Sequence, residues 1–141
     1  MKQTYQSIRI NAPVDKVWDT IKDFHDLSWA PNVVTKCETV GDKSGSEIGA
    51  KRILNDAFHE ALIELDNATH TIRYSIDNGP SPVSPEDVKG YVGHVHLLPI
   101  TKDNTTFAQW SSSWESDSED AVEFCHTIYV ALLDEMANSI G

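Results

Sequence analysis

The longest pattern in the chain is an alternation of apolar and polar residues that runs, with breaks, from residue 33 to residue 115. A period of two is typical of strands that bury one face. It predicts six strands, near 33–40, 47–54, 57–66, 69–77, 88–99 and 104–115, and the start of the chain predicts a seventh at 3–10. The breaks are short and hold turn residues, as in "GDKSGS" and "TKDNT", which favours antiparallel neighbours. This pattern predicts a seven-stranded antiparallel sheet, which is expected to twist and curl.

Two segments carry the 3.6-residue period of a helix instead. In "NAPVDKVWDTIKDF", Pro13 suits the first position of a helix, and apolar side chains recur on one face. A second helical turn is predicted in "DLSWAPNV", where Pro31 ends it. From residue 116 onward the sequence predicts a long helix with a capping box of Ser116 and Glu119, and Ser118 is a competing N-cap. Its apolar stripe comprises Ala121, Cys125, Ile128, Leu132 and Met136, with Phe124, Tyr129 and Leu133 beside it.

The predicted order is a strand, one or two short helices, six strands and a long helix, so the fold class is α+β. The length of 141 residues suits a single domain that covers residues 1–141. One apolar helix face has to cover one face of the sheet, but a helix is narrower than a curled sheet. We therefore expect a cavity between the sheet and the long helix.

Acidic side chains outnumber basic ones by 22 to 11, and the formal net charge is −11. This charge repels phosphate backbones and anionic lipid surfaces, so we expect neither nucleic acid nor a membrane as a partner. The start "MKQTYQSIRI" lacks the apolar run of a signal peptide, and no window is apolar enough for a membrane span. Cys37 and Cys125 form no CxxC pair and are expected to be buried, reduced thiols in a cytoplasmic protein.

Several short motifs look like metal or catalytic sites but lack partners. His94 and His96 in "VGHVHLLPI" share one face of a predicted strand, opposite Tyr91. A zinc site needs at least three protein ligands, and the neighbouring strand offers no cysteine or carboxylate cluster, so no metal is expected. Cys125 and His126 diverge by about 100° on a helix and do not form a nucleophile–base pair. The glycines form neither a phosphate-binding loop nor a dinucleotide fingerprint, so no cofactor is expected.

Polar and aromatic side chains recur inside the predicted strands, where a plain core would need only apolar ones. Arg52 lies in "GAKRIL", and Glu60 lies in "FHEALIELD". Alternation places Glu60 on one face with Leu62 and Glu64. Tyr74, Tyr91 and Trp110 are the aromatic candidates. Strand arginines and glutamates most often face solvent, and strand aromatics most often pack, so alternation alone does not decide which side chains face the cavity.

The order and spacing of several motifs resemble one superfamily along almost the whole chain. The motifs are "APVDKVWDTIKDF", "IGAKRIL", "HEALIELD", "IRYSI", "YVGHVHLLP", "TTFAQWSSSWES" and "YVALLDEM". The chain is similar to the helix-grip superfamily of START-related and birch-pollen-allergen-like proteins. Within it the chain resembles the polyketide cyclase/dehydrase-like branch, often called SRPBCC, which includes the lachrymatory factor synthase and the abscisic-acid receptors. The resemblance implies a curled seven-stranded sheet around a long C-terminal helix, and it makes a homodimer one expected assembly.

The resemblance also implies which side chains face the cavity. The Arg of a "GAxR" strand and the Glu of an "ExLxxxD" strand tend to face it in that branch, and here these are Arg52 and Glu60. Two tyrosines and a tryptophan match aromatic positions of the lining. In the synthase, similar Arg, Glu and Tyr positions are implicated in moving a proton on a small substrate. The implied ligand-binding set is Arg52, Glu60, Leu62, Tyr74, Tyr91, Trp110, Ile128 and Leu132.

Two functions are compatible with these residues. In the first, a small hydrophobic or amphipathic molecule binds in the cavity, and Arg52 can anchor a ligand carboxylate. In the second, the chain is a cyclase, dehydratase or isomerase in which Glu60 is the acid/base, Arg52 its partner and Tyr91 or Tyr74 a proton donor. Binding is favoured over catalysis, because no side chain is an unmistakable nucleophile or base.

The entrance of the cavity is expected near the loops at 41–46, 55–57 and 78–87, with the proline-rich loop 78–87 as a candidate lid. A third function, the recruitment of a partner protein, would be favoured by an exposed tryptophan such as Trp29 beside this entrance.

Overall fold

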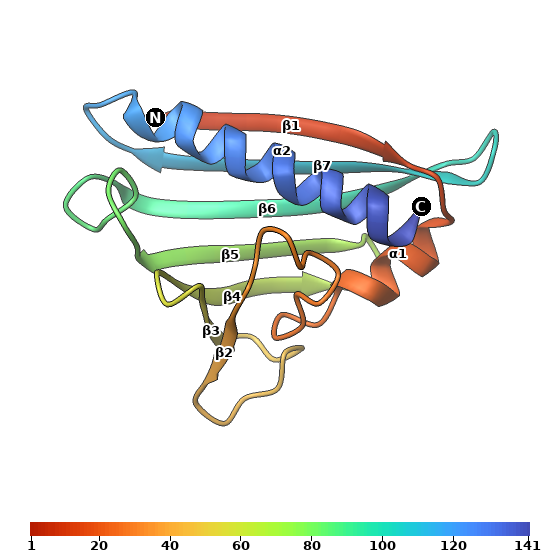
Figure 1. The fold of residues 1–141 in the computed structure, drawn as a ribbon, viewed down its shortest axis with the longest axis horizontal. Coiled ribbons are helices and arrows are strands. Elements are labelled where there is room, and N and C mark those ends of the chain that lie inside the picture. Colours follow the sequence, from red (N-terminus) through yellow and green to blue (C-terminus); the bar gives the residue numbers. More distant parts are fainter.

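The computed structural model describes residues 1–141 and contains one seven-stranded antiparallel sheet with two helices (Figure 1). The strands are β1 (Lys2–Ile10), β2 (Cys37–Val40), β3 (Lys51–Leu54), β4 (Phe58–Asp66), β5 (Thr71–Asn78), β6 (Lys89–Ile100) and β7 (Thr105–Glu115), and the helices are α1 (Val14–Ile21) and α2 (Asp120–Ile140). The strand order is β1-β7-β6-β5-β4-β3-β2, so the first strand pairs with the last. The predicted α+β helix-grip fold is confirmed.

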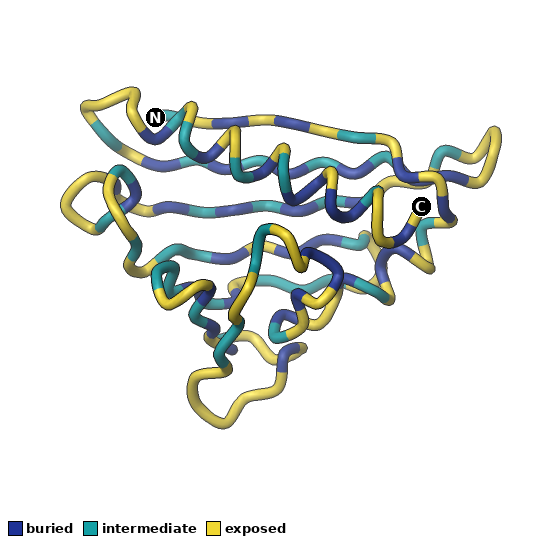
Figure 2. The backbone as a smooth tube through the Cα atoms, in the orientation of Figure 1, coloured by how far each residue is buried: buried dark blue, intermediate teal, exposed yellow.

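The long helix covers only part of the sheet. α2 packs against β1 and β7, and the segment between α1 and β2 lies in front of the other half of the sheet (Figure 1). Buried and half-buried positions alternate along β6 and β7, as expected for strands with one face on a core (Figure 2). The buried core includes Trp114, Leu97 and Met136. Neither helix combines the length and the apolar character needed to cross a membrane.

Two of the strands are shorter than the sequence predicts. The strand expected at 33–40 begins only at Cys37, because the amides of Val33 and Val34 both donate to the Ala30 carbonyl in consecutive turns. The strand expected at 47–54 begins at Lys51, since Ala50 closes a turn on the Glu47 carbonyl. Before β2 the turn bonds replace ladder bonds, whereas before β3 the turn coexists with two hydrogen bonds to Leu62 of β4, from the Gly49 amide and to the Ala50 carbonyl.

The helix starts also differ from the prediction. Pro13 precedes α1 as its N-cap residue in an extended conformation, and the segment 26–33 forms turns without a second helix. The predicted capping box of Ser116 and Glu119 is wrong, because Ser116 Oγ donates instead to the Asp87 carbonyl at 2.9 Å. The Ser118 hydroxyl accepts a hydrogen bond from the first helical amide, that of Asp120, at 3.1 Å.

An irregularity in β4 changes which face one carboxylate occupies. Alternation places Glu64 on the same face as Glu60 and Leu62, but the register shifts between Leu62 and Glu64. Glu64 therefore pairs with Arg73, beside the inward Tyr74, and accepts a hydrogen bond from Arg73 Nε at 2.9 Å on the outer face. The expected position of Glu64 is wrong because a bulge shifts the alternation by one residue.

Candidate functional site

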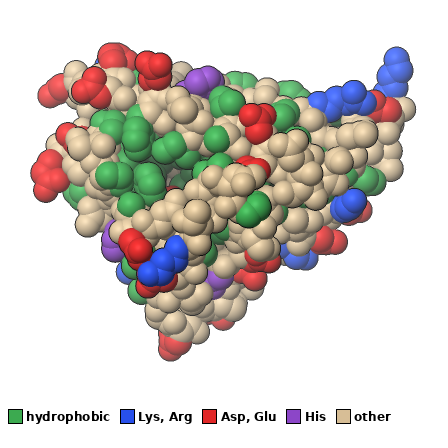
Figure 3. Space-filling model, viewed as in Figure 1, with side chains coloured by type: hydrophobic (Ala, Val, Ile, Leu, Met, Phe, Trp, Pro, Cys, Tyr) green, Lys and Arg blue, Asp and Glu red, His purple; other side chains and the backbone are tan.

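A cavity opens between α2 and the half of the sheet that α2 leaves uncovered. It is lined by 18 residues, of which 15 are hydrophobic. Figure 3 shows hydrophobic side chains gathered around a hollow beside the N-terminal half of α2. The space inside that water-sized molecules can occupy is small, about 60 Å³, and the total empty space with the open mouth is about 580 Å³. The inner space has room for a few water molecules, so a larger occupant requires side chains at the mouth to move.

Two charged side chains project into this apolar space. Arg52 on β3 and Glu60 on β4 lie directly opposite each other across the antiparallel ladder, and each is only 6% exposed. Arg52 Nε and Nη2 lie 2.8 Å and 2.7 Å from the same carboxylate oxygen, Glu60 Oε1. Arg52 Nη1 donates to the Phe24 carbonyl at 2.9 Å, and the Phe24 ring lies 3.8 Å from the guanidinium carbon. The guanidinium is thus held in place by its neighbours.

The second carboxylate oxygen of Glu60 is not used in this pair. None of the protein's hydrogen bonds reaches Oε2, although Glu60 lines the cavity. Burial raises the pKa of Glu60, and the attraction of Arg52 opposes that rise without cancelling it. A buried carboxylate with one uncommitted oxygen can accept a hydrogen bond or a proton from an occupant of the cavity.

Three tyrosine hydroxyls meet on the other wall of the cavity. Trp110 Nε1 donates to Tyr74 Oη at 3.0 Å, and Tyr74 Oη donates to Tyr129 Oη at 2.7 Å. Tyr129 Oη and Tyr91 Oη form the next hydrogen bond, and Tyr91 Oη donates to Cys125 Sγ at 3.4 Å. Burial raises the pKa of all three phenols well above the usual value, so they stay protonated at neutral pH.

A glycine in β6 makes room for this cluster. A Cβ atom on Gly93 would lie 2.2 Å from Cζ of Tyr74, so the tyrosine ring packs directly over the glycine backbone. Gly93 and Tyr74 are opposite each other in the β5–β6 register. Any larger residue at position 93 would displace the Tyr74 ring and its hydroxyl from the cluster.

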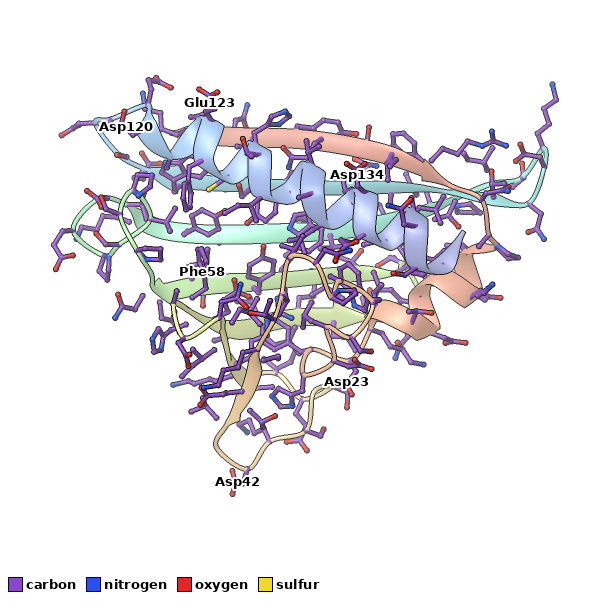
Figure 4. All side chains as sticks on the ribbon, in the orientation of Figure 1. Asp23, Asp42, Phe58, Asp120, Glu123 and Asp134 are labelled. Carbon is purple, nitrogen blue, oxygen red and sulfur yellow. The ribbon has the colours of Figure 1, made fainter.

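The mouth of the cavity is formed by half-buried apolar side chains. Phe58, at the start of β4 and labelled in Figure 4, has its ring centroid 6.4 Å from that of Phe124 on α2. Val83, which is fully buried, reaches the lining from the proline-rich loop, and half-buried Val33 reaches it from the turns before β2. These turns are tied to α2, because Glu135 Oε1 accepts the Asn32 amide hydrogen at 2.6 Å.

The residues predicted from the sequence lie mostly around this one cavity. Those in its lining are Arg52, Glu60, Tyr74, Tyr91, Trp110, Ile128 and Leu132. Leu62 is buried in the core and is not part of the lining. Sequence reasoning missed Tyr129 as a polar member of the site, although a tyrosine within the apolar face of a helix is a signal for a buried hydroxyl. It also missed the mouth residues Phe58 and Phe124.

Other candidate features lie elsewhere. His94 and His96 stack at a centroid distance of 5.8 Å on the face of β6 opposite the buried Tyr91. Burial lowers the pKa of His94, and the positive charge of Arg73 lowers it further. No group of three or more His, Cys, Asp or Glu side chains is arranged to hold a metal ion. Trp29 is only 6% exposed, so the exposed tryptophan that would favour a partner-recruiting function is absent. Cys125 is buried as expected, but Cys37 is only half-buried.

Comparisons with known proteins agree with this architecture. The family model described as polyketide cyclase / dehydrase and lipid transport matches residues 1–140. A solved structure from Nitrosospira multiformis is 46% identical, covering 99% of this chain and 97% of that chain, with a TM-score of 0.97. The protein XoxI from Bacillus cereus is 23% identical (99% and 96% covered, TM-score 0.81), and a protein from Thermobifida fusca is 22% identical (97% and 91% covered, TM-score 0.79). The last two likenesses show the fold alone. No curated protein matches the chain.

Proposed function

The chain belongs to the polyketide cyclase/dehydrase and lipid-transport family, and on this premise we propose that it binds a small hydrophobic or amphipathic molecule between the sheet and α2. The observation that carries the proposal is the pairing of an apolar cavity with a buried ion pair whose carboxylate keeps one oxygen uncommitted. A ligand site is usually apolar, with a few placed polar groups that fix the orientation of the ligand. Burying Arg52 and Glu60 costs desolvation free energy, which a plain core would avoid.

The size of the cavity restricts the ligand. The inner space of about 60 Å³ holds only a few waters, whereas the space with the mouth is about 580 Å³. We infer that the ligand is slim, and that Phe58 and Phe124 change rotamer when it enters, since both are half-buried at the mouth. We propose the cytoplasm as the compartment, because both cysteines are unpaired thiols. We also propose that residues 1–141 act as one domain, because one sheet runs through them.

A second candidate function is proton transfer on a small substrate, and the environment of Glu60 favours it. Burial raises the pKa of this carboxyl, and Oε2 is free to take a proton from a bound molecule. Arg52 would stabilise the charged form of the acid. The proposed role of Tyr91 is less direct, because its hydroxyl hydrogen is directed at Cys125 and would first have to turn toward a substrate.

The binding proposal is tested by filling the cavity. Ile128→Trp places an indole in the lining, and Val130→Trp is the matched control because Val130 is exposed on the same helix and does not line the cavity. Titrations with benzene and hexan-1-ol, followed by amide shifts in NMR spectra, should give saturable shifts around the cavity. We expect Ile128→Trp to weaken both affinities at least tenfold and Val130→Trp to leave them unchanged. Equal affinities in the two variants would contradict the proposal.

A further inference from the structure

Resting on that proposed function, we propose that the cavity selects slim apolar molecules that end in a neutral hydroxyl group and discriminates against carboxylates. The sequence alone suggested the opposite, namely that Arg52 anchors a ligand carboxylate. The geometry points away from this, because the arginine already holds Glu60 and the tyrosine hydroxyls of the cavity donate their hydrogens within their own cluster.

The phenol cluster, formed by the hydroxyls of Tyr74, Tyr91 and Tyr129, offers hydrogen-bond acceptors and no free hydroxyl hydrogen. Trp110 donates to Tyr74, Tyr74 donates to Tyr129, and Tyr91 donates to Cys125. The geometry leaves the donor between Tyr129 and Tyr91 open, and because the single hydrogen of Tyr91 is directed at Cys125, we infer that Tyr129 donates to Tyr91. Each phenol therefore donates its single hydrogen within the cluster and keeps one oxygen lone pair. The only uncommitted hydrogen in the cluster is that of the Cys125 thiol, which is a weak donor.

The ion pair offers one strong acceptor beside spare N–H groups. Arg52 donates hydrogen bonds from Nε to Glu60 and from Nη1 to the Phe24 carbonyl, and the Glu60 carboxylate, which also lies 2.7 Å from Nη2, balances its charge. Glu60 Oε2 accepts nothing from the protein. The pair as a whole is neutral, so a third charge brought into the apolar cavity would have no counter-charge.

These groups match a hydroxyl better than either common charged head group. A hydroxyl both donates, to Glu60 Oε2, and accepts, from a remaining N–H of Arg52. A carboxylate has no hydrogen to donate, would face the Glu60 carboxylate, and would carry an unbalanced charge into an apolar space. An ammonium would satisfy Glu60 but would place a second cation beside Arg52 and could accept no hydrogen bond.

Three probes with one alkyl chain separate these cases: hexan-1-ol, hexanoate and hexylammonium, each titrated at pH 7.5 and followed by amide shifts of the cavity residues. We expect hexan-1-ol to bind at least tenfold more tightly than hexanoate and more tightly than hexylammonium. If hexanoate or hexylammonium binds as tightly as the alcohol or more tightly, the head-group inference is overturned while the binding function stands. If none of the three binds, the proposed function itself fails.

A charge variant tests the cause of the selection. Glu60→Gln leaves the Arg52 charge unbalanced, so the preference for hexan-1-ol over hexanoate should fall at least tenfold. Glu64→Gln makes the same change in net charge on the outer face of the same strand and should leave the preference unchanged. An unchanged preference in Glu60→Gln would overturn the inference. Should that variant not fold, the wild type still decides: hexanoate should bind more tightly as falling pH converts it to the neutral acid, and affinity independent of pH would overturn the inference.

Discussion

The two halves of the concave sheet face differ in how their buried polar side chains are hydrogen-bonded. On the β1–β7 side, where α2 packs against the sheet, most buried polar side chains are small or neutral and are paired with each other, and the exception is the indole Nε1 of Trp114, which has no partner. Thr4 and Ser112 hydroxyls lie 2.7 Å apart, and Gln6 hydrogen-bonds both the Trp110 carbonyl and His126 Nδ1. On the β5–β4–β3 side, the buried polar groups include a full ion pair and keep hydrogen-bonding capacity in reserve.

The difference shows where the fold keeps capacity for a ligand. Contact with α2 closes one half, and the buried donors and acceptors there are paired within the protein, apart from Trp114 Nε1, because neither water nor a ligand can supply a partner. The other half is open to a mouth, so an uncommitted oxygen such as Glu60 Oε2 can be satisfied by water or by a ligand. Polar atoms without a hydrogen-bond partner in this half are therefore available to a ligand.

The largest effect is expected from a substitution that breaks the ion pair of the open half. Glu60→Leu leaves the Arg52 guanidinium buried without a counter-charge and should lower the free energy of unfolding by about 3–5 kcal/mol. The double variant with Arg52→Leu should recover most of that loss, because an apolar pair of similar volume suits an apolar cavity. Urea unfolding followed by circular dichroism measures both.

The same two strands provide the control. Glu64 and Arg73 form an ion pair on the outer face of β4 and β5, where both side chains are nearly half exposed. Glu64→Leu should cost less than about 1 kcal/mol, because solvent screens exposed pairs. Equal losses for Glu60→Leu and Glu64→Leu would show that the inner pair is not desolvated.

A smaller effect is expected from the phenol cluster. Tyr129→Phe removes the acceptor for the Tyr74 hydrogen and the donor to Tyr91, which should cost about 1–3 kcal/mol of unfolding free energy. Tyr5→Phe is the matched control, because the Tyr5 hydroxyl donates to Gln109 on the exposed outer face. This control should change stability by no more than about 0.5 kcal/mol. A Tyr129→Phe protein as stable as the control would mean that the cluster contributes no stability.

The smallest effect is a pH dependence with a defined sign. The pKa of Glu60 is raised by burial in the folded state above its ordinary value of 4.5, so the folded protein binds this proton more tightly than the unfolded chain does. Stability from this group is fully present below pH 4.5 and is lost as pH rises through the folded pKa. The stability of wild type relative to Glu60→Gln should therefore fall from pH 4 upward and then level off. If the relative stability rises over this range instead, the pKa of Glu60 is not raised by burial in the folded protein.

Much of the fold could be predicted from the sequence because it follows from periodicity. The alternation of residues 57–115 and the apolar stripe of the last helix are repeated many times, so single exceptions do not hide them. The placement of Arg52 and Glu60 at one cavity came from a resemblance, since alternation alone left their face open. The short strands β2 and β3 were overestimated, because turn hydrogen bonds at Val33 and Ala50 leave no mark on the hydrophobic pattern.

The parts that could not be predicted depend on single tertiary contacts. The bulge after Leu62 turns Glu64 outward, and no residue type announces it. The role of Tyr129 depends on its distance to two tyrosines that are 55 and 38 residues away in sequence. Trp29 looked available for a partner, but the turns around it fold under α2, where Ser139 Oγ donates to its carbonyl at 2.6 Å.

The most direct test of the central claim locates a bound small molecule. Nuclear Overhauser contacts between hexan-1-ol and the protein report which side chains lie near the probe. We expect contacts to Ile128, Phe58 and Tyr74, which line the cavity. Contacts confined to the outer face around Tyr5 and His94, with none to the cavity side chains, would contradict the claim.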